Sequence, residues 1–204
     1  MVRLSFRSPA DLPAAVAAAR EAVSGHGVIA APTETYYGLS VDPADDRAVA
    51  RLSALKGRAA DKSLLVVGAS LEQLADLVAM TPELRRWLDG VWPAPLSVIL
   101  PARRRLAAAG ATLAVRVPGH ELLRALLERT GPLTSSSANR SGAPPPTRPD
   151  EVAGEFGERL DLLLDGGATP GGLPSTLIDA TGNELRVVRA GAWPTPPDGI
   201  VKRG

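Results

Sequence analysis

Short apolar runs alternate along the chain with segments in which apolar residues recur every three or four positions. A short apolar run predicts a buried strand, and such runs occupy 28–31, 64–67, 97–100, 113–117, 133–137, 162–164, 176–179 and 185–189. The helical spacing occupies 11–25, 46–55, 70–80, 82–88, 120–129 and 150–156. Because predicted strands and helices interleave from one end to the other, we expect an α/β fold.

The length of 204 residues suits one sizeable core and is short for two, so we expect a single domain over 1–204 with its core from about 8 to 193. The proline- and glycine-rich stretch 140–149 lies between predicted elements and is interpreted as a loop within that domain. The tail 194–204 is expected to be loosely ordered.

Composition removes several classes of function. The chain contains no cysteine, which excludes a disulfide framework, a thiolate nucleophile and cysteine-ligated metal sites. Its two histidines, His26 and His120, are too few for a histidine-rich metal site, so we expect no bound metal of that kind. No apolar run approaches the roughly 18 residues of a membrane span, and the N-terminal segment has no apolar leader. We therefore expect no membrane contact and a cytoplasmic location.

The basic residues are unevenly divided between the two types. Net charge is only +1, so any anionic ligand must be held by local cations. Of 23 basic residues 20 are arginine, yet Lys56 and Lys62 flank Arg58 in the middle of the chain. A compact ammonium group suits a phosphate site, and chance retention of lysine is the alternative.

Polar clusters follow several of the predicted strands. They comprise 33–35, 56–62, 112–116, 135–139, and Ser175 together with Arg189. In an α/β sheet such loops converge on one ligand crevice. Their hydroxyls, carboxamide, lysines and arginines can hold phosphates and carboxylates through charge-assisted hydrogen bonds.

Four features carry competing interpretations. Glu34 and His120 could be a base and its helper, or a structural acceptor and the start of a helix. The serines of 135–139 could be only a turn. The glycines of 166–172 match neither a Walker nor a Rossmann pattern and favour a mobile surface loop. The run 103–105 could touch RNA, although a solvated surface is the usual role of a short charge run.

The clusters, taken in order, resemble the YrdC/TsaC family of threonylcarbamoyl-AMP synthases. The matching stretches are Pro-Thr-Glu-Thr-Tyr-Tyr-Gly-Leu at 32–39, Lys-Gly-Arg at 56–58 with Lys62, Trp-Pro-Ala-Pro-Leu-Ser at 92–97, Leu-Ala-Val-Arg-Val-Pro at 113–118, Ser-Ser-Ser-Ala-Asn-Arg-Ser-Gly at 135–142, and Pro-Ser-Thr at 174–176 followed by Arg189. Two features resemble the short single-domain branch of this family. Position 67 is the apolar residue valine, and the chain ends soon after Arg189.

The resemblance implies a fold, a reaction and partners. The fold is one domain with a twisted, mixed, open sheet flanked by helices and a basic groove. The reaction joins L-threonine, bicarbonate and ATP, the latter with Mg²⁺, into threonylcarbamoyl-AMP for the t6A modification of tRNA beside the anticodon. The enzyme would be a nucleotidyltransferase without a tightly bound cofactor, working with downstream tRNA-modification proteins and possible direct RNA contact.

The resemblance also assigns roles to residues. Lys56 and Arg58 would be catalytic and should lie in solvent-accessible loops. The residues assigned to ATP are Lys56, Arg58, Lys62, Thr112, Ser137, Asn139 and Arg189. The residues assigned to threonine are Thr33 or Thr35, Arg116, Ser135 and Ser175, with Arg116 as the partner of the carboxylate.

Two rival functions remain open at this point. One is a non-catalytic RNA-binding module of the same fold that assists ribosome or tRNA maturation. The other is a carbamoyl-transferring enzyme, because similar domains occur in hydrogenase-maturation proteins. An RNA binder should show salt-dependent RNA affinity, whereas the synthase should release pyrophosphate only with threonine.

Overall fold

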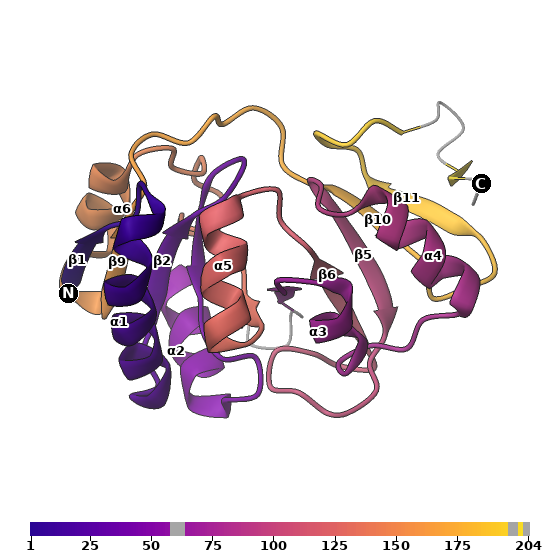
Figure 1. Cartoon of the computed structure of the whole chain (residues 1–204), viewed down its shortest axis with the longest axis horizontal. Coiled ribbons are helices and arrows are strands. Elements are labelled where there is room, and N and C mark those ends of the chain that lie inside the picture. Colours follow the sequence, from indigo (N-terminus) through magenta and orange to yellow (C-terminus); the bar gives the residue numbers. More distant parts are fainter. Residues whose placement is uncertain (58–63, 196–199, 202–204) are drawn as a thin grey trace.

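The strands form two sheets in the computed structural model, which describes residues 1–57, 64–195 and 200–201 (Figure 1). The first sheet has the order β1 (Val2–Ser5), β9 (Leu162–Asp165), β2 (Ile29–Pro32), β3 (Tyr37–Ser40), β8 (Ser136–Ser137). The second has the order β12 (Ile200–Val201), β11 (Leu185–Arg189), β10 (Thr176–Asp179), β5 (Leu96–Pro101), β6 (Thr112–Arg116), β4 (Leu65–Val67), β7 (Leu133–Thr134).

Both sheets are mixed. In the first, β1, β9 and β2 run parallel, whereas β3 pairs antiparallel with β2 and β8. In the second, β10 runs parallel to β5 and β4 parallel to β6, while β5 and β6 are antiparallel. The predicted α/β class and mixed pairing are confirmed, but the strands divide between two sheets where one was expected.

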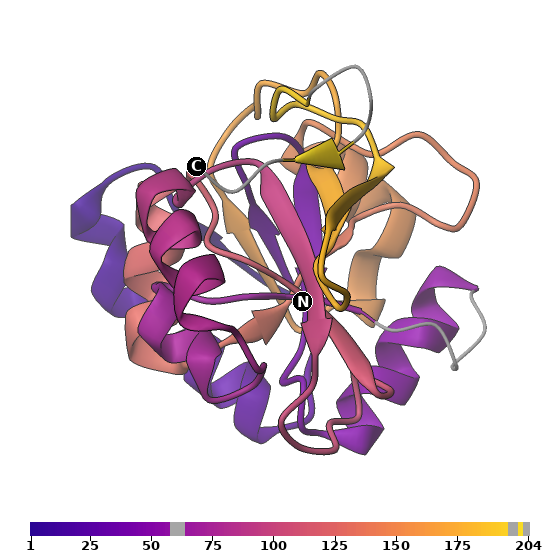
Figure 2. The same ribbon diagram turned by 90° about the vertical axis from the view of Figure 1, so that its right-hand side faces the viewer.

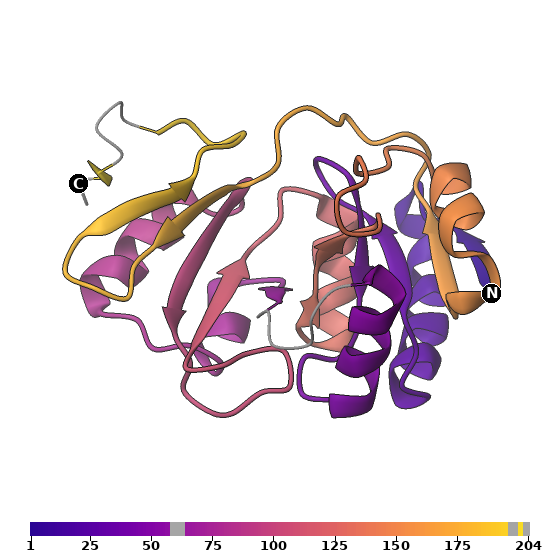
Figure 3. The ribbon, with the colours of Figure 1, turned by 180° about the vertical axis from the view of Figure 1, so that it is seen from behind.

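Helices cover the first sheet on both faces. Figure 1 shows α1 (Leu12–Ser24) and α5 (Glu121–Thr130) side by side on one face, and Figure 3 shows α2 (Asp46–Lys56) and α6 (Pro149–Phe156) on the other. Seen from its own end in Figure 2, the second sheet carries α3 (Leu71–Ala75) and α4 (Pro82–Val91). Short 3-10 turns occupy Pro9–Asp11 and Gly157–Arg159. None of the helices described is long and apolar enough to cross a bilayer.

Two apolar clusters hold the layers together. The larger joins the sheets, because Leu39 and Leu163 of the first belong to one buried cluster with Val98 and Val115 of the second. The smaller packs α1 and α5 against the first sheet and includes the fully buried Ile29 of β2. Burial of aliphatic side chains on both sheet faces accounts for the uninterrupted apolar runs of these strands.

Several elements differ from those predicted. Strands β1, β3 and β12 were not expected: β1 is short and mostly exposed, Tyr37 was read as the end of a polar segment, and Ile200–Val201 of the tail pairs with β11. The helix predicted over 70–80 ends at Ala75, because Val78 leaves the helix and forms a bridge with Ala102. Tertiary pairing overrides local spacing at each of these places.

Candidate functional site

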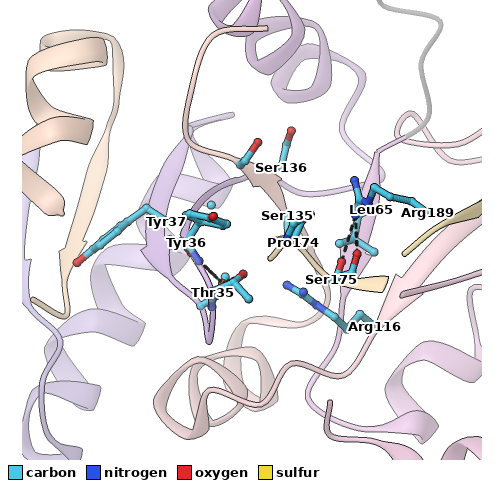
Figure 4. Close-up of a pocket in the computed structure, with 13 residues that line it drawn as sticks. Thr35, Tyr36, Tyr37, Leu65, Arg116, Ser135, Ser136, Pro174, Ser175 and Arg189 are labelled. Carbon is cyan, nitrogen blue, oxygen red and sulfur yellow. Dashed lines mark hydrogen bonds between the residues drawn. The ribbon is translucent and has the colours of Figure 1, made fainter. Parts of the chain in front are cut away.

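A cleft of about 240 Å³ opens between the two sheets, and its walls come from both (Figure 4). Its lining residues are Thr33, Thr35, Tyr36, Tyr37, Gly38, Leu65, Arg116, Ser135, Ser136, Ser137, Pro174, Ser175 and Arg189. All five positions assigned to threonine line this cleft, together with two of those assigned to ATP. Segments far apart in the sequence therefore converge as the strand-end argument predicted.

One wall is the tight turn that joins β2 to β3. The backbone N–H and hydroxyl of Thr33 both donate to the carbonyl of Tyr36, at 3.1 and 2.8 Å. The hydroxyls of Thr33 and Thr35 are 3.2 Å apart, and both side chains are buried. Because both threonines line the cleft, either hydroxyl can reach a ligand.

The serine segment 135–137 forms the neighbouring wall. Ser135 N donates to the carbonyl of Leu65 at 2.7 Å, which ties this segment to the second sheet. Ser136 and Ser137 pair with β3 of the first sheet. A Cβ on Gly38 would lie 3.1 Å from the Ser135 hydroxyl, so glycine permits this close approach.

Ser175 and Arg189 form the wall on the second sheet. The Arg189 guanidinium donates to the carbonyl of Ser175 at 2.8 Å, and its contact with the Ser175 hydroxyl is 3.4 Å. Behind them the buried Ser97 hydroxyl lies 3.0 Å from that of Ser175. The Ser175 hydroxyl is thus oriented from two sides.

Arg116 is the most deeply buried cation of the cleft wall, with 4% of its side chain exposed. Its closest acidic partner is Glu34, at 3.4 Å between Nη1 and Oε1, and its Nε has no hydrogen bond. Burial lowers the pKa of Arg116, Glu34 raises it, and the like charge of Arg189 lowers it further. Arginine stays charged under all these influences, so the cleft wall carries a buried positive charge.

His120 is the N-cap residue of helix α5, which agrees with its interpretation as the start of a helix. Its Nδ1 accepts from Leu123 N at 3.2 Å, and its ring stacks on Phe6. Burial lowers the pKa of His120 while nearby Glu34 raises it. An accepting Nδ1 and a lowered pKa describe a neutral imidazole that caps a helix.

The expectation that Lys56 is solvent-accessible is wrong. Lys56 is the last residue of α2, which Gly57 ends in a left-handed conformation, and it is only 5% exposed. Its Nζ donates to the carbonyls of Ser137 and Asn139, the latter at 2.8 Å. The serine segment folds over the helix end and buries the ammonium group. Lys56 therefore anchors the loop that carries two positions assigned to ATP.

The remaining ATP assignments are scattered. The Asn139 amide donates to the carbonyls of Arg140 and Ala143, and its buried Oδ1 has no hydrogen bond. Asn139 lines a separate pocket of about 350 Å³. Thr112 lies at the opposite end of β6 from Arg116, about 13 Å away at the usual rise of a strand, and it does not line the cleft. Arg58 and Lys62 lie outside the described residues.

The glycine-rich segment 166–174 connects the first sheet to the second and crosses over the top of the molecule (Figures 1 and 3). A mobile surface loop was predicted here, but hydrogen bonds tie it down. Gly171 N donates to the carbonyl of Thr35 at 2.7 Å. The Tyr37 hydroxyl accepts from Gly166 N at 3.1 Å and donates to the carbonyl of Gly167 at 2.7 Å.

Sequence reasoning missed some residues of the cleft. Tyr36, Leu65 and Pro174 line it without having been assigned a role. The two tyrosines of the chain are adjacent, at 36 and 37, and this pairing in a chain with 3% aromatic residues was the available signal. Leu65 carried no signal, because it belongs to an ordinary apolar run. Within the described ranges, no three His, Cys, Asp or Glu side chains gather where they could hold a metal.

Comparison with known proteins places the chain in a family. The Sua5/YciO/YrdC family model, described as telomere recombination, matches residues 21–191. The chain belongs to the Sua5/YciO/YrdC family. A threonylcarbamoyl-AMP synthase of Shigella boydii is 41% identical over 84% of this chain and 94% of its own length. One of Pyrococcus abyssi is 40% identical over 82% of this chain.

The structural likeness agrees with the sequence likeness. The crystal structure of P. abyssi Sua5 complexed with L-threonine has a TM-score of 0.87 and 34% identity, covering 94% of this chain and 58% of that one. The present chain spans about half the length of the P. abyssi relative, 51%. The predicted family and the YrdC-like fold are thereby confirmed.

Proposed function

We propose that this protein is an L-threonylcarbamoyladenylate synthase, which makes threonylcarbamoyl-AMP from L-threonine, bicarbonate and ATP. The observation that carries the proposal is the convergence of Thr33, Thr35, Arg116, Ser135 and Ser175 on one cleft. Two relatives of 40% and 41% identity bear the name of this enzyme, and a close structural neighbour binds L-threonine.

The chemistry of the cleft suits an amino acid with a hydroxyl side chain. Arg116 supplies a buried positive charge for a carboxylate, and arginine can bind a carboxylate through two parallel hydrogen bonds. The hydroxyls on the opposite walls both donate and accept, so they can bond to a hydroxyl and to an amine. A volume of about 240 Å³ accommodates a ligand of this size.

The reaction consists of two steps in which atoms balance. The threonine amine attacks the carbon of bicarbonate, water leaves, and a carbamate forms. A carbamate oxygen then attacks the α-phosphorus of ATP, and pyrophosphate leaves. Neither step needs a covalent bond to the protein, so positioning and fixed positive charge can supply the catalysis. The enzyme is then a nucleotidyltransferase.

ATP enters as its Mg²⁺ complex, with the metal held mainly by phosphate oxygens and water. We assign the nucleotide to the side of the cleft that Ser137 lines and to the neighbouring pocket that Asn139 lines. Lys56 shapes this side by holding the carbonyls of both residues. By family likeness, Arg58 and Lys62 remain assigned to the triphosphate and Thr112 to the nucleotide site, and the groove is expected to be basic.

The setting proposed for the enzyme is the cytoplasm, where it would hand its product to other tRNA-modification proteins. A non-catalytic RNA-binding module remains the alternative function. The names of the relatives favour the synthase over that alternative. The run 103–105 is exposed, as expected of a solvated charge run.

The decisive experiment measures pyrophosphate release from MgATP and bicarbonate. Reactions with L-threonine, with L-serine and without amino acid are compared. Release that depends on L-threonine supports the synthase, and mass spectrometry should find threonylcarbamoyl-AMP in the same tube. If the folded protein releases no pyrophosphate under any of these conditions, the proposal is wrong. Salt-dependent RNA binding by the same sample would then favour the alternative.

A further inference from the structure

Glu34 stands beside the cleft without a role in the proposed reaction. It occupies the turn between β2 and β3, flanked by the two threonines of the cleft wall, and 17% of its side chain is exposed. Both of its carboxylate oxygens are shielded from solvent and have no hydrogen bond. Among the described residues its ion-pair partner is Arg116, 3.4 Å away.

The hydrogen bonding of this pair is incomplete. The Nε of Arg116 and both oxygens of Glu34 are buried and unbonded. A buried ion pair usually needs further hydrogen bonds to offset the loss of hydration, and buried polar atoms without partners are uncommon. The Glu34–Arg116 pair therefore keeps binding capacity next to a ligand cleft, as a functional site would.

The neighbours of Glu34 hold its side chain in place, and none of those described here forms a hydrogen bond with its carboxylate. A Cβ on Gly119 would lie 3.6 Å from both Cβ and Cγ of Glu34, so the backbone packs closely on its stem. His120 is a helix cap with a lowered pKa, and Arg124 donates to the carbonyl of Pro118 at 2.8 Å. Arg189, whose charge lowers the pKa of Arg116, adds a second positive charge to the cleft lining.

We propose that Glu34 makes the cleft selective for a zwitterionic amino acid over a carboxylic acid that lacks the amino group. The inference rests on the proposed function, because L-threonine is such a zwitterion. Arg116 and Arg189 alone would attract any carboxylate. The negative charge of Glu34 offsets part of that attraction and favours an ammonium group, and both effects act through space in a site of low polarity.

This role requires no contact between Glu34 and the ligand. The pair presents a dipole that matches the dipole of the zwitterion, with the positive end on the cleft wall. Discrimination against the simple acid comes from the unfavourable charge as much as from the favourable one. Glu34 is thus a specificity-determining residue that acts together with Arg116.

The test is the variant Glu34→Gln, which removes the charge and keeps the shape. Binding of L-threonine and of (R)-3-hydroxybutanoate, which is threonine without its amino group, is measured by calorimetry on wild type and variant. In the variant the preference for L-threonine should fall by at least about tenfold, with weaker threonine binding and equal or tighter hydroxybutanoate binding. Glu34→Asp, which keeps the charge, should retain most of the preference.

The matched control is Glu72→Gln, which removes the carboxylate of an exposed ion pair with Arg85. That variant should bind both ligands as wild type does. An equal loss of both ligands in Glu34→Gln would overturn the inference, because it would mean that Glu34 only supports the fold. If Glu34→Gln does not fold, loss of the preference in Glu34→Asp overturns it. Wild type that does not bind L-threonine would overturn the proposed function as well.

Discussion

Two arginine–carboxylate sites in this protein differ in how fully they are hydrogen-bonded. Asp165, at the end of β9, accepts from Arg3 at 3.1 and 2.7 Å, from Arg7 at 2.9 Å and from Gly167 N at 2.9 Å. Glu34 has Arg116 at 3.4 Å and no hydrogen bond on either oxygen. The carboxylate of Asp165 is saturated with hydrogen bonds, whereas that of Glu34 has none and lies beside a cleft.

The difference is visible in the acidity of Asp165. Burial raises its pKa, but hydrogen bonds from Arg7, Arg3 and Gly167 outweigh burial and hold the pKa at about 2. Such a carboxylate stabilises the folded state while it is ionised, because protonation would weaken its hydrogen bonds. Saturated charges serve stability, and unsaturated buried charges are those to examine for ligand binding.

The strongest test of this difference is to remove one arginine from each site. Arg116→Met should lower threonine-dependent pyrophosphate release by about 100-fold, because the buried partner for the carboxylate is lost. Arg3→Met should lower stability and leave turnover per folded molecule unchanged. Steady-state kinetics with varied L-threonine measures both variants, and an equal loss of activity in the two would contradict the distinction.

Removing the saturated carboxylate should affect stability alone. Its ordinary pKa of 3.8 falls to about 2 in the fold, which corresponds to about 2 kcal/mol of unfolding free energy. A lowered pKa stabilises above pH of about 4 and loses its effect as pH falls toward 2. Wild type should therefore exceed Asp165→Asn by about 2 kcal/mol at neutral pH, in urea unfolding.

That advantage should shrink steadily between pH 4 and pH 2, within the interval set by the two pKa values of Asp165. A stability difference that stays constant across this interval would mean that the carboxylate charge is not what the arginines stabilise. Pyrophosphate release at neutral pH, per folded molecule, should match wild type and provides the internal control.

The smallest expected effect concerns Tyr37, which lines the cleft and also contacts the backbone beside Asp165. Tyr37 is fully buried, and burial raises its pKa to about 12, so its hydroxyl stays protonated while it bridges Gly166 and Gly167 next to Asp165. Tyr37→Phe should cost about 1 kcal/mol and speed amide hydrogen exchange in 166–174. Tyr36→Phe, whose hydroxyl bonds to the Gly172 carbonyl in a more exposed place, should cost less. A larger cost for Tyr36→Phe would contradict the assignment of Tyr37 as the main anchor.

Most of the cleft could be anticipated from the chain alone. Thr33 and Thr35 follow an apolar run and Arg116 ends another, and the carboxyl ends of neighbouring strands meet at one edge. Ser175 lies instead directly before strand β10. The α/β class followed from the alternation of periods, which depends only on which side chains face a core. Likeness of motifs then supplied the family, which the comparisons confirmed.

Two features of the site could not be anticipated, because each depends on a partner distant in sequence. Lys56 is buried only because 137–139 folds over the end of α2. The segment 166–174 is tied down only because Tyr36 and Tyr37 lie beneath it.

Local pattern therefore determined the type of most main elements and the chemical groups at their ends. Tertiary structure decided which charges are buried, which are saturated and which face the cleft, as the pairing of Glu34 with Arg116 shows. The physical reason is that periodicity reflects burial of one residue at a time, whereas the state of a charge depends on all the groups packed around it.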